Sequence, residues 1–144
     1  KIVEEVGENR GPLVERFQKA VGGQAGDAWC ACFCGFCVEE VEHHLNIRSL
    51  LFKSPSVWQM YHRSNKSCQV SHPMRGFIVC FNKPGTILGH CGIIEKVNSD
   101  TFVSIEGNSN NKGDREGDGV VRQTRPLKGY SNLKVLGYLD AFPI

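Results

Sequence analysis

A cysteine near the start of a predicted helix is the residue best suited to covalent chemistry in this chain. Cys30 follows the segment 26–29, and an apolar stretch with helical spacing begins behind it, so its thiol is expected in the first helical turn. The positive end of a helix dipole favours the thiolate, which is the form that attacks a carbonyl carbon. A histidine must then accept the thiol proton, and a third group must orient the imidazole. Cys30 therefore predicts the nucleophile of a thiol hydrolase.

The candidate base is His90, which opens an apolar run, while Glu106 and Asn108 end the next one. A short polar turn separates the two runs, so they are expected to pair as a hairpin. If the turn centres near Ser99, His90 lies opposite Asn108, and a centre one residue earlier places it opposite Glu106. Cross-strand neighbours lie about 5 Å apart, and side chains two residues apart share a face. Either register therefore brings His90 beside both candidates, with Glu106 ranked first as its orienting partner.

The elements that must position these residues change type near the middle of the chain. Apolar spacing predicts helices before Pro73 and short strands after it, with Asp27 as the N-cap of the second helix. Helices followed by antiparallel strands predict an α+β fold, with N-terminal helices packed on a C-terminal sheet. Residues 1–144 are expected to form one catalytic domain. The expected helices cover about 12–21, 28–44 and 57–61, and the expected strands cover 77–81, 90–97, 101–105, 120–124 and 135–139.

Length and charge narrow the classes of partner. The chain has 144 residues and a formal net charge of +2, which is too weak to indicate nucleic acid. No apolar run approaches the roughly 20 residues of a membrane span, so we do not expect membrane insertion. We also expect no nucleic-acid binding, and we expect the protein to be a monomer. The sequence begins at Lys1, which suggests a processed or excised piece whose missing N-terminus could hold a targeting segment or another domain.

Seven cysteines are present, and four of them crowd into one predicted helix at positions 30, 32, 34 and 37. Close neighbours on a helix cannot easily bridge one another, so most thiols are expected to be small buried hydrophobes, although disulfides among the others stay open. Zinc is disfavoured because ligands along one helix diverge around its axis, and His43 and His44 are expected to interact with the helix C-terminus. We expect no cofactor and no bound metal.

A polar, glycine-rich stretch at residues 109–119 is expected to be an exposed loop. Asp114, Glu116 and Asp118 are spaced as in a calcium loop, but the distal bidentate glutamate of an EF-hand is missing. A solvated loop is favoured, and calcium binding stays open.

Four short motifs, taken in order, resemble those of the CHAP domain. They are GENRGP at 7–12, GDAWCA at 26–31, GHCGI at 89–93 and EGN at 106–108. CHAP domains belong with the NlpC/P60-type, papain-like peptidoglycan hydrolases, many of them phage endolysins or bacterial autolysins. The resemblance extends over about residues 7–142, and the order and spacing of the motifs make it specific.

The resemblance implies a papain-like fold in which Cys30, His90, Glu106 and Asn108 form the catalytic set. It also implies that the partner is bacterial peptidoglycan, cut at the muramoyl-L-alanine amide or at a peptide bond of the stem or cross-bridge. Such a protein would be made in the host cytoplasm and act at the cell wall, in the periplasm or outside the cell. The bond that is cut and the target organism stay open.

Two tryptophans are candidates for lining a substrate groove. Trp29 precedes the nucleophile and Trp58 lies on the third predicted helix, and for each the alternative is a place in the core. Two alternative functions also stay open. One is a papain-like thiol hydrolase, transferase or effector acting on a protein, and the other is a non-catalytic wall-binding module, which would require a damaged triad.

Overall fold

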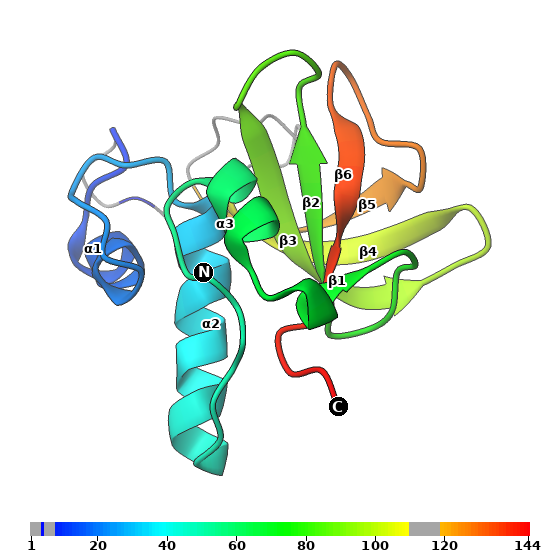
Figure 1. Cartoon of the computed structure of the whole chain (residues 1–144). Helices are drawn as coiled ribbons and strands as arrows, with labels where there is room; N and C mark the ends of the chain where they lie inside the picture. Colours follow the sequence, from blue (N-terminus) through cyan, green and yellow to red (C-terminus); the bar gives the residue numbers. More distant parts are fainter. Residues whose placement is uncertain (1–3, 5–7, 110–118) are drawn as a thin grey trace.

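The described part of the chain, in a computed structural model, comprises residue 4 and residues 8–109 and 119–144. It forms three α-helices, one 3-10 helix and six strands (Figure 1), which confirms the predicted α+β class. In chain order they are α1 (Pro12–Ala20), α2 (Cys30–Leu45), α3 (Val57–Arg63), η1 (Lys66–Cys68), β1 (Gln69–Val70), β2 (Ile78–Asn82), β3 (Gly89–Val97), β4 (Thr101–Ser109), β5 (Gly119–Pro126) and β6 (Lys134–Leu139).

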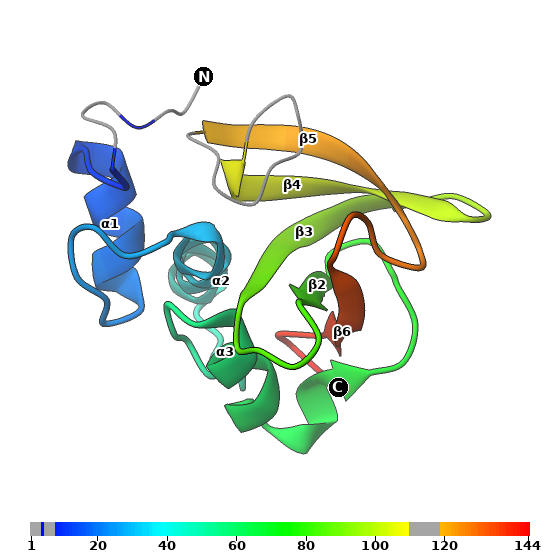
Figure 2. The same cartoon turned by 90° about the horizontal axis from the view of Figure 1, so that it is seen from above.

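The strands form one antiparallel sheet in the order β1-β6-β2-β3-β4-β5. Figure 2 shows that the sheet curls strongly, and that α2 lies between α1 and the sheet. Side chains alternate across the sheet, so each face has its own core. In β2, Ile78 and Cys80 pack with the helices, whereas Val79 and Phe81 pack inside the curl with Phe102.

The start of α2 is held by α1 through a buried glutamine. The side-chain amide of Gln18 donates hydrogen bonds to the carbonyl oxygens of Asp27 at 2.8 Å and Asn9 at 2.9 Å. Next to it, the Trp29 ring stacks on Phe17 with centroids 5.8 Å apart. These contacts fix the backbone immediately before Cys30, where the helix begins.

The expected cap of α2 is wrong. The N-cap position is Trp29, whose side chain makes no capping hydrogen bond. The Asp27 carboxylate instead accepts a hydrogen bond from the backbone N–H of Gln24 at 2.8 Å. Short acidic side chains compete for nearby loop amides in this way, so Asp27 stabilises the turn before the helix rather than the helix itself.

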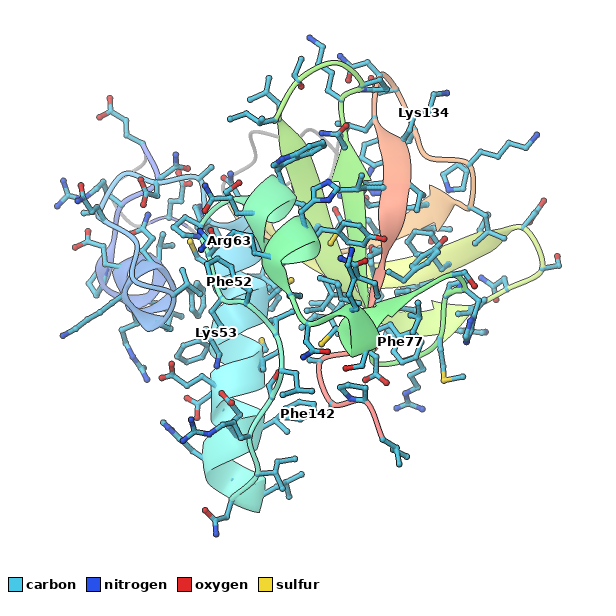
Figure 3. The ribbon with its side chains drawn as sticks, in the orientation of Figure 1. Phe52, Lys53, Arg63, Phe77, Lys134 and Phe142 are labelled. Carbon is cyan, nitrogen blue, oxygen red and sulfur yellow. The ribbon has the colours of Figure 1, made fainter. Side chains whose placement is uncertain are left out.

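The connection from α2 to α3 runs back along α2. Lys53 Nζ lies 2.6 Å from Glu42 Oε1, and the Arg63 guanidinium carbon lies 4.4 Å from the centre of the Phe52 ring. Figure 3 shows Phe52 and Arg63 side by side beside α2. These contacts join the connection to α2 and to α3, and α3 in turn meets the sheet at β2, β3 and β6.

The third helix and all five expected strands are present, with several extended by a few residues. The short elements η1 and β1 were not predicted, because three- and two-residue elements carry too little periodicity. Of the expected 109–119 loop, residues 110–118, including Asp114, Glu116 and Asp118, lie outside the described residues. No helix in the described ranges is long and apolar enough to span a membrane.

Candidate active site

Cys30 lies in the first turn of α2, as predicted, although the helix begins at Cys30 itself and not at about residue 28. Its exposed fraction is 4%. The backbone N–H of Phe33 donates to the Trp29 carbonyl at 2.9 Å, so the N–H groups of residues 30–32 precede the first bond of the helical ladder. The sulfur therefore lies at the positive end of a 16-residue helix. This position favours a thiolate and provides backbone donors around it.

His90 and Glu106 form a hydrogen-bonded pair in which both side chains are 0% exposed. The distance from His90 Nε2 to Glu106 Oε1 is 2.8 Å. Because the carboxylate accepts the Nε2 proton, the lone pair of neutral His90 lies on Nδ1. Among the described residues, Nδ1 has no hydrogen-bond partner at ordinary distance, but Cys30 is close enough to interact with the ring. The imidazole thus connects the thiol to the carboxylate.

The charges of this cluster oppose the effect of burial on the pKa of each group. Burial alone would lower the pKa of His90, but hydrogen bonds and charge interactions with Cys30 and Glu106 raise it to about 9. Burial would raise the pKa of Glu106, but His90 and Arg125 hold it at about 2. At neutral pH the carboxylate is therefore ionised and His90 can hold a proton beside the sulfur.

The hairpin that carries His90 and Glu106 has the register centred on Ser99 where it nears the site. The pairs there are Ile93↔Ile105 and Ile94↔Ser104, and a bulge shifts the pairing between Ile94 and Lys96. Extended further, this register would set His90 opposite Asn108, but the β3–β4 pairing ends before that point and His90 pairs with Phe81 of β2. Glu106 reaches His90 diagonally instead.

Gly92 makes room for that diagonal reach. A Cβ on Gly92 would lie 2.6 Å from Glu106 Cγ and 3.0 Å from the Ile105 carbonyl oxygen. Both distances are shorter than ordinary van der Waals contact. The absence of a side chain at this position on β3 lets Glu106 lie over the strand and face the imidazole.

Two further residues hold Glu106, and sequence reasoning did not identify either. Ser104 Oγ donates to Glu106 Oε2 at 2.5 Å. Arg125 Nε lies 3.0 Å from Oε2, and Arg125 Nη2 lies 2.6 Å from Oε1. Arg125 is only 5% exposed. The one available signal was general: a buried carboxylate requires a cationic or hydrogen-bonding partner, and Arg125 lies on the strand that follows Glu106.

Asn108 is buried two residues after Glu106 on β4, and it differs from Glu106 in its contacts. It is 1% exposed, and its φ of 53° is in the left-handed region. Its Oδ1 has no hydrogen-bond partner in the part of the chain that the structure describes. The side chain bonded to His90 Nε2 is Glu106, so Cys30, His90 and Glu106 form a linked set and Asn108 lies two residues beyond it.

The two tryptophans have different environments. Trp29 is 0% exposed, and its indole N–H donates to Glu4 Oε2 at 2.7 Å. The structure therefore places Trp29 in the core and leaves none of its ring surface open to a substrate. Trp58 is half-buried beside a surface depression of about 320 Å³ that also contains Asn82 and Ile87. Asn82 pairs with Gly89, the neighbour of His90, and a substrate contact by Trp58 stays a prediction.

The other cysteines form a thiol-rich core behind the nucleophile. None of the seven cysteines forms a disulfide, and Cys34 Sγ lies 3.7 Å from Cys91 Sγ. Burial raises the pKa of Cys32 and Cys37 to about 12, and it raises the pKa of Cys80 and Cys91 well above the ordinary value of a thiol. Thiols of this kind stay protonated and pack as small apolar groups. No group of three potential ligands for a metal ion occurs among the described residues.

Comparison with known proteins gives one match. A family model described as the CHAP domain matches residues 22–108, which is more than half of the chain. No curated protein and no solved structure matches. The matched range contains Cys30, His90, Glu106 and Asn108, and it ends before Arg125.

Proposed function

This chain belongs to the CHAP domain family, and we propose that it hydrolyses an amide bond of bacterial cell wall with Cys30 as nucleophile. The family is papain-like, and its members are in general peptidoglycan hydrolases and amidases. The resemblance identified from its motifs is thereby confirmed. The observation that carries the proposal is the buried His90–Glu106 pair at 2.8 Å with Cys30, at the start of α2, interacting with the same imidazole.

The first step is formation of the thiolate. His90 takes the Cys30 proton on Nδ1, because Nε2 is already bonded to Glu106. The resulting imidazolium lies between a thiolate and a carboxylate, both of which favour its positive charge. The dipole of α2 favours the negative sulfur. Glu106 therefore acts on the reaction by orienting His90 and stabilising its charged form.

The second step is attack of the sulfur on the carbonyl carbon of the scissile amide. The developing oxyanion requires donors aimed at it, and the backbone N–H of Cys30 at the start of α2 suits that role. His90 then gives its proton to the departing amine, which leaves a thioester on Cys30. Water, deprotonated by His90, hydrolyses the thioester and regenerates the thiol.

The biological setting that follows is lysis of a bacterial wall, as an endolysin or an autolysin. In this proposal the protein is made in the host cytoplasm and acts as a monomer at the wall, and it requires no nucleic acid, membrane insertion or cofactor. Either the muramoyl-L-alanine amide or a peptide bond of the stem or cross-bridge fits an amide-cleaving thiol.

The test is lysis of purified peptidoglycan by the full chain and by matched cysteine variants. Cys30→Ser should abolish lysis while leaving thermal unfolding close to wild type, whereas Cys37→Ala on the same helix should keep it. Mass spectrometry of the released fragments identifies the bond, since an amidase frees the amino group of the stem alanine. Full activity of Cys30→Ser would show that Cys30 is not the nucleophile. A folded wild type that releases nothing from the wall would favour a protein substrate or a binding role.

A further inference from the structure

An arginine lies buried behind the carboxylate of the site. Arg125 on β5 is 5% exposed and meets Glu106 on β4 with two N–H groups, at 3.0 Å to Oε2 and 2.6 Å to Oε1. This two-point contact matches the planar fork of a guanidinium to a carboxylate. Figure 2 shows β3, β4 and β5 side by side along the curled sheet, so His90, Glu106 and Arg125 span three neighbouring strands.

The hydrogen bonds of Glu106 occupy both of its oxygens. Oε1 accepts from His90 Nε2 and from Arg125 Nη2, whereas Oε2 accepts from Ser104 Oγ and from Arg125 Nε. Rotating the carboxylate away from His90 would break the fork. Arg125 therefore restricts Glu106 to an orientation in which one oxygen faces the imidazole.

Arg125 is itself held in place from its other side. Its guanidinium carbon lies 3.7 Å from the centre of the Tyr130 ring, and Tyr130 packs edge-on against Phe81 with centroids 5.1 Å apart. Stacking on an aromatic face adds to the attraction of a desolvated guanidinium. The side chain is thus fixed between an aromatic ring and a carboxylate.

We propose that Arg125 is a positioning residue of the active site: its fork fixes the Glu106 carboxylate against His90 Nε2, and so selects the imidazole orientation that serves Cys30. The effect on turnover rests on the proposed function, but the effect on Cys30 reactivity does not. In this role Arg125 touches neither the substrate nor the sulfur, and it acts through Glu106.

The same contact determines when Glu106 is ionised. The titratable groups that face Glu106 are His90 from β3, Arg125 from β5 and Tyr130 from the β5–β6 connection. Tyr130 is neutral because burial raises its pKa. Burial also disfavours the Glu106 anion, and it is His90 and Arg125 that lower the pKa of this carboxyl. Removing Arg125 should therefore raise the pKa of Glu106 and bring its titration into the range of an activity assay.

A second arginine on β5 provides a matched control. Arg122 also contacts a glutamate with two nitrogens, at 2.7 and 3.2 Å from the oxygens of Glu95. Its side chain is 64% exposed, however, and solvent weakens such a pair. Arg122→Gln removes an arginine–glutamate fork from the same strand without touching Glu106.

The experiment compares Arg125→Gln, Arg125→Lys and Arg122→Gln as full chains. Three quantities are measured against pH: kcat and KM on a soluble wall fragment, and the rate of Cys30 alkylation by iodoacetamide. Arg125→Gln should lower kcat by about 10- to 100-fold with little change in KM, since misplaced groups lose rate rather than binding. As the solution is made more acidic, kcat and the alkylation rate of this variant should begin to fall at a higher pH than those of wild type. Arg125→Lys should recover part of the loss because it keeps the charge without the fork, and Arg122→Gln should match wild type.

The outcomes separate the two proposals. Wild-type kcat and pH profiles in folded Arg125→Gln and Arg125→Lys would overturn the positioning role, while wall lysis by those variants would leave the proposed function intact. The positioning role would also be overturned if activity fell only in proportion to the unfolded fraction while the alkylation profile stayed unchanged. If wild type does not cleave wall, the alkylation profiles still decide the role of Arg125. If Arg125→Gln does not fold, the Arg125→Lys profiles decide it.

Discussion

Glu106 Oε1 lies 2.8 Å from His90 Nε2, with both side chains completely removed from solvent. Because Nε2 donates a hydrogen bond to the carboxylate, Nδ1 is the imidazole nitrogen that can accept the proton of the Cys30 thiol. A buried carboxylate that is ionised at neutral pH stabilises imidazolium more strongly than an exposed one would. The basicity of His90 therefore depends in part on Glu106, which raises its pKa.

Glu106→Gln should reduce kcat by about 10-fold or more, which corresponds to roughly 1.4 kcal/mol of barrier. The amide keeps the shape of the side chain but lacks the charge that stabilises the imidazolium. It also leaves Arg125 buried without its anion, so we expect a loss of about 3–5 kcal/mol in the free energy of unfolding. Turnover per folded molecule and urea unfolding measure the two effects separately.

The control for this variant is Glu95→Gln, which removes the carboxylate of the exposed pair with Arg122. Both rate and stability should stay close to wild type, because exposed ion pairs contribute little. His90→Ala should be nearly inactive. Wild-type kcat in Glu106→Gln would show that the third catalytic role belongs elsewhere.

Iodoacetamide should label Cys30 before any other cysteine and inactivate the protein. The thiolate is the reactive form, and the raised pKa values of Cys32 and Cys37, about 12 in each case, keep those thiols protonated. Cys37 is the informative comparison, since it is half-buried whereas Cys30 is buried. Peptide mapping after brief alkylation gives the order of labelling. Faster modification of Cys37 would mean that exposure, and not the His90 pair, determines reactivity.

Activity should persist into mildly alkaline solution and then fall as the pH rises through about 9. The pKa of His90 is raised from its ordinary 6.5 to about 9, so the imidazolium required to protonate the leaving amine is present below that range and lost above it. Glu106, with a pKa of about 2, stays ionised throughout. The pH profile of kcat/KM measures the alkaline limb. Glu106→Gln should shift this limb to lower pH, and an unshifted limb would contradict the assignment.

Several features of the site could be predicted because they depend on local sequence. Helical spacing placed Cys30 in the first turn of α2, and the short turn around Ser99 predicted that β3 and β4 pair as a hairpin, with two registers left open. Both signals lie within a few residues of the feature that they determine. The same local signal was misleading at Asp27, because a loop amide competed for its carboxylate.

Other features depend on contacts between distant segments, which periodicity does not report. Arg125 reaches Glu106 from the next strand, and its role follows only from that pairing. Trp29 is buried because α1 packs over it, a contact that the sequence could not report, since it left a groove and the core as equal alternatives. The β3–β4 pairing ends before His90, so the diagonal approach of Glu106 to His90 could not be predicted from hairpin register, although Glu106 had been ranked ahead of Asn108.

Two substitutions should distinguish what the backbone of Asn108 contributes from what its side chain contributes. Its φ of 53° suits Asn or Gly, and an alanine there costs about 1–2 kcal/mol of stability. Its buried Oδ1 lacks a partner among the described residues, and such an unpaired acceptor is retained at a cost, which suggests use during turnover. We therefore expect Asn108→Gly to fold as stably as wild type and to lose rate, but less than Glu106→Gln. Asn108→Ala should show the same rate loss and a lower melting temperature.

Melting curves and kcat/KM for the two variants test this prediction. Wild-type kcat/KM in Asn108→Gly would restrict Asn108 to the backbone, and a loss larger than that of Glu106→Gln would reverse the ranking of the two residues.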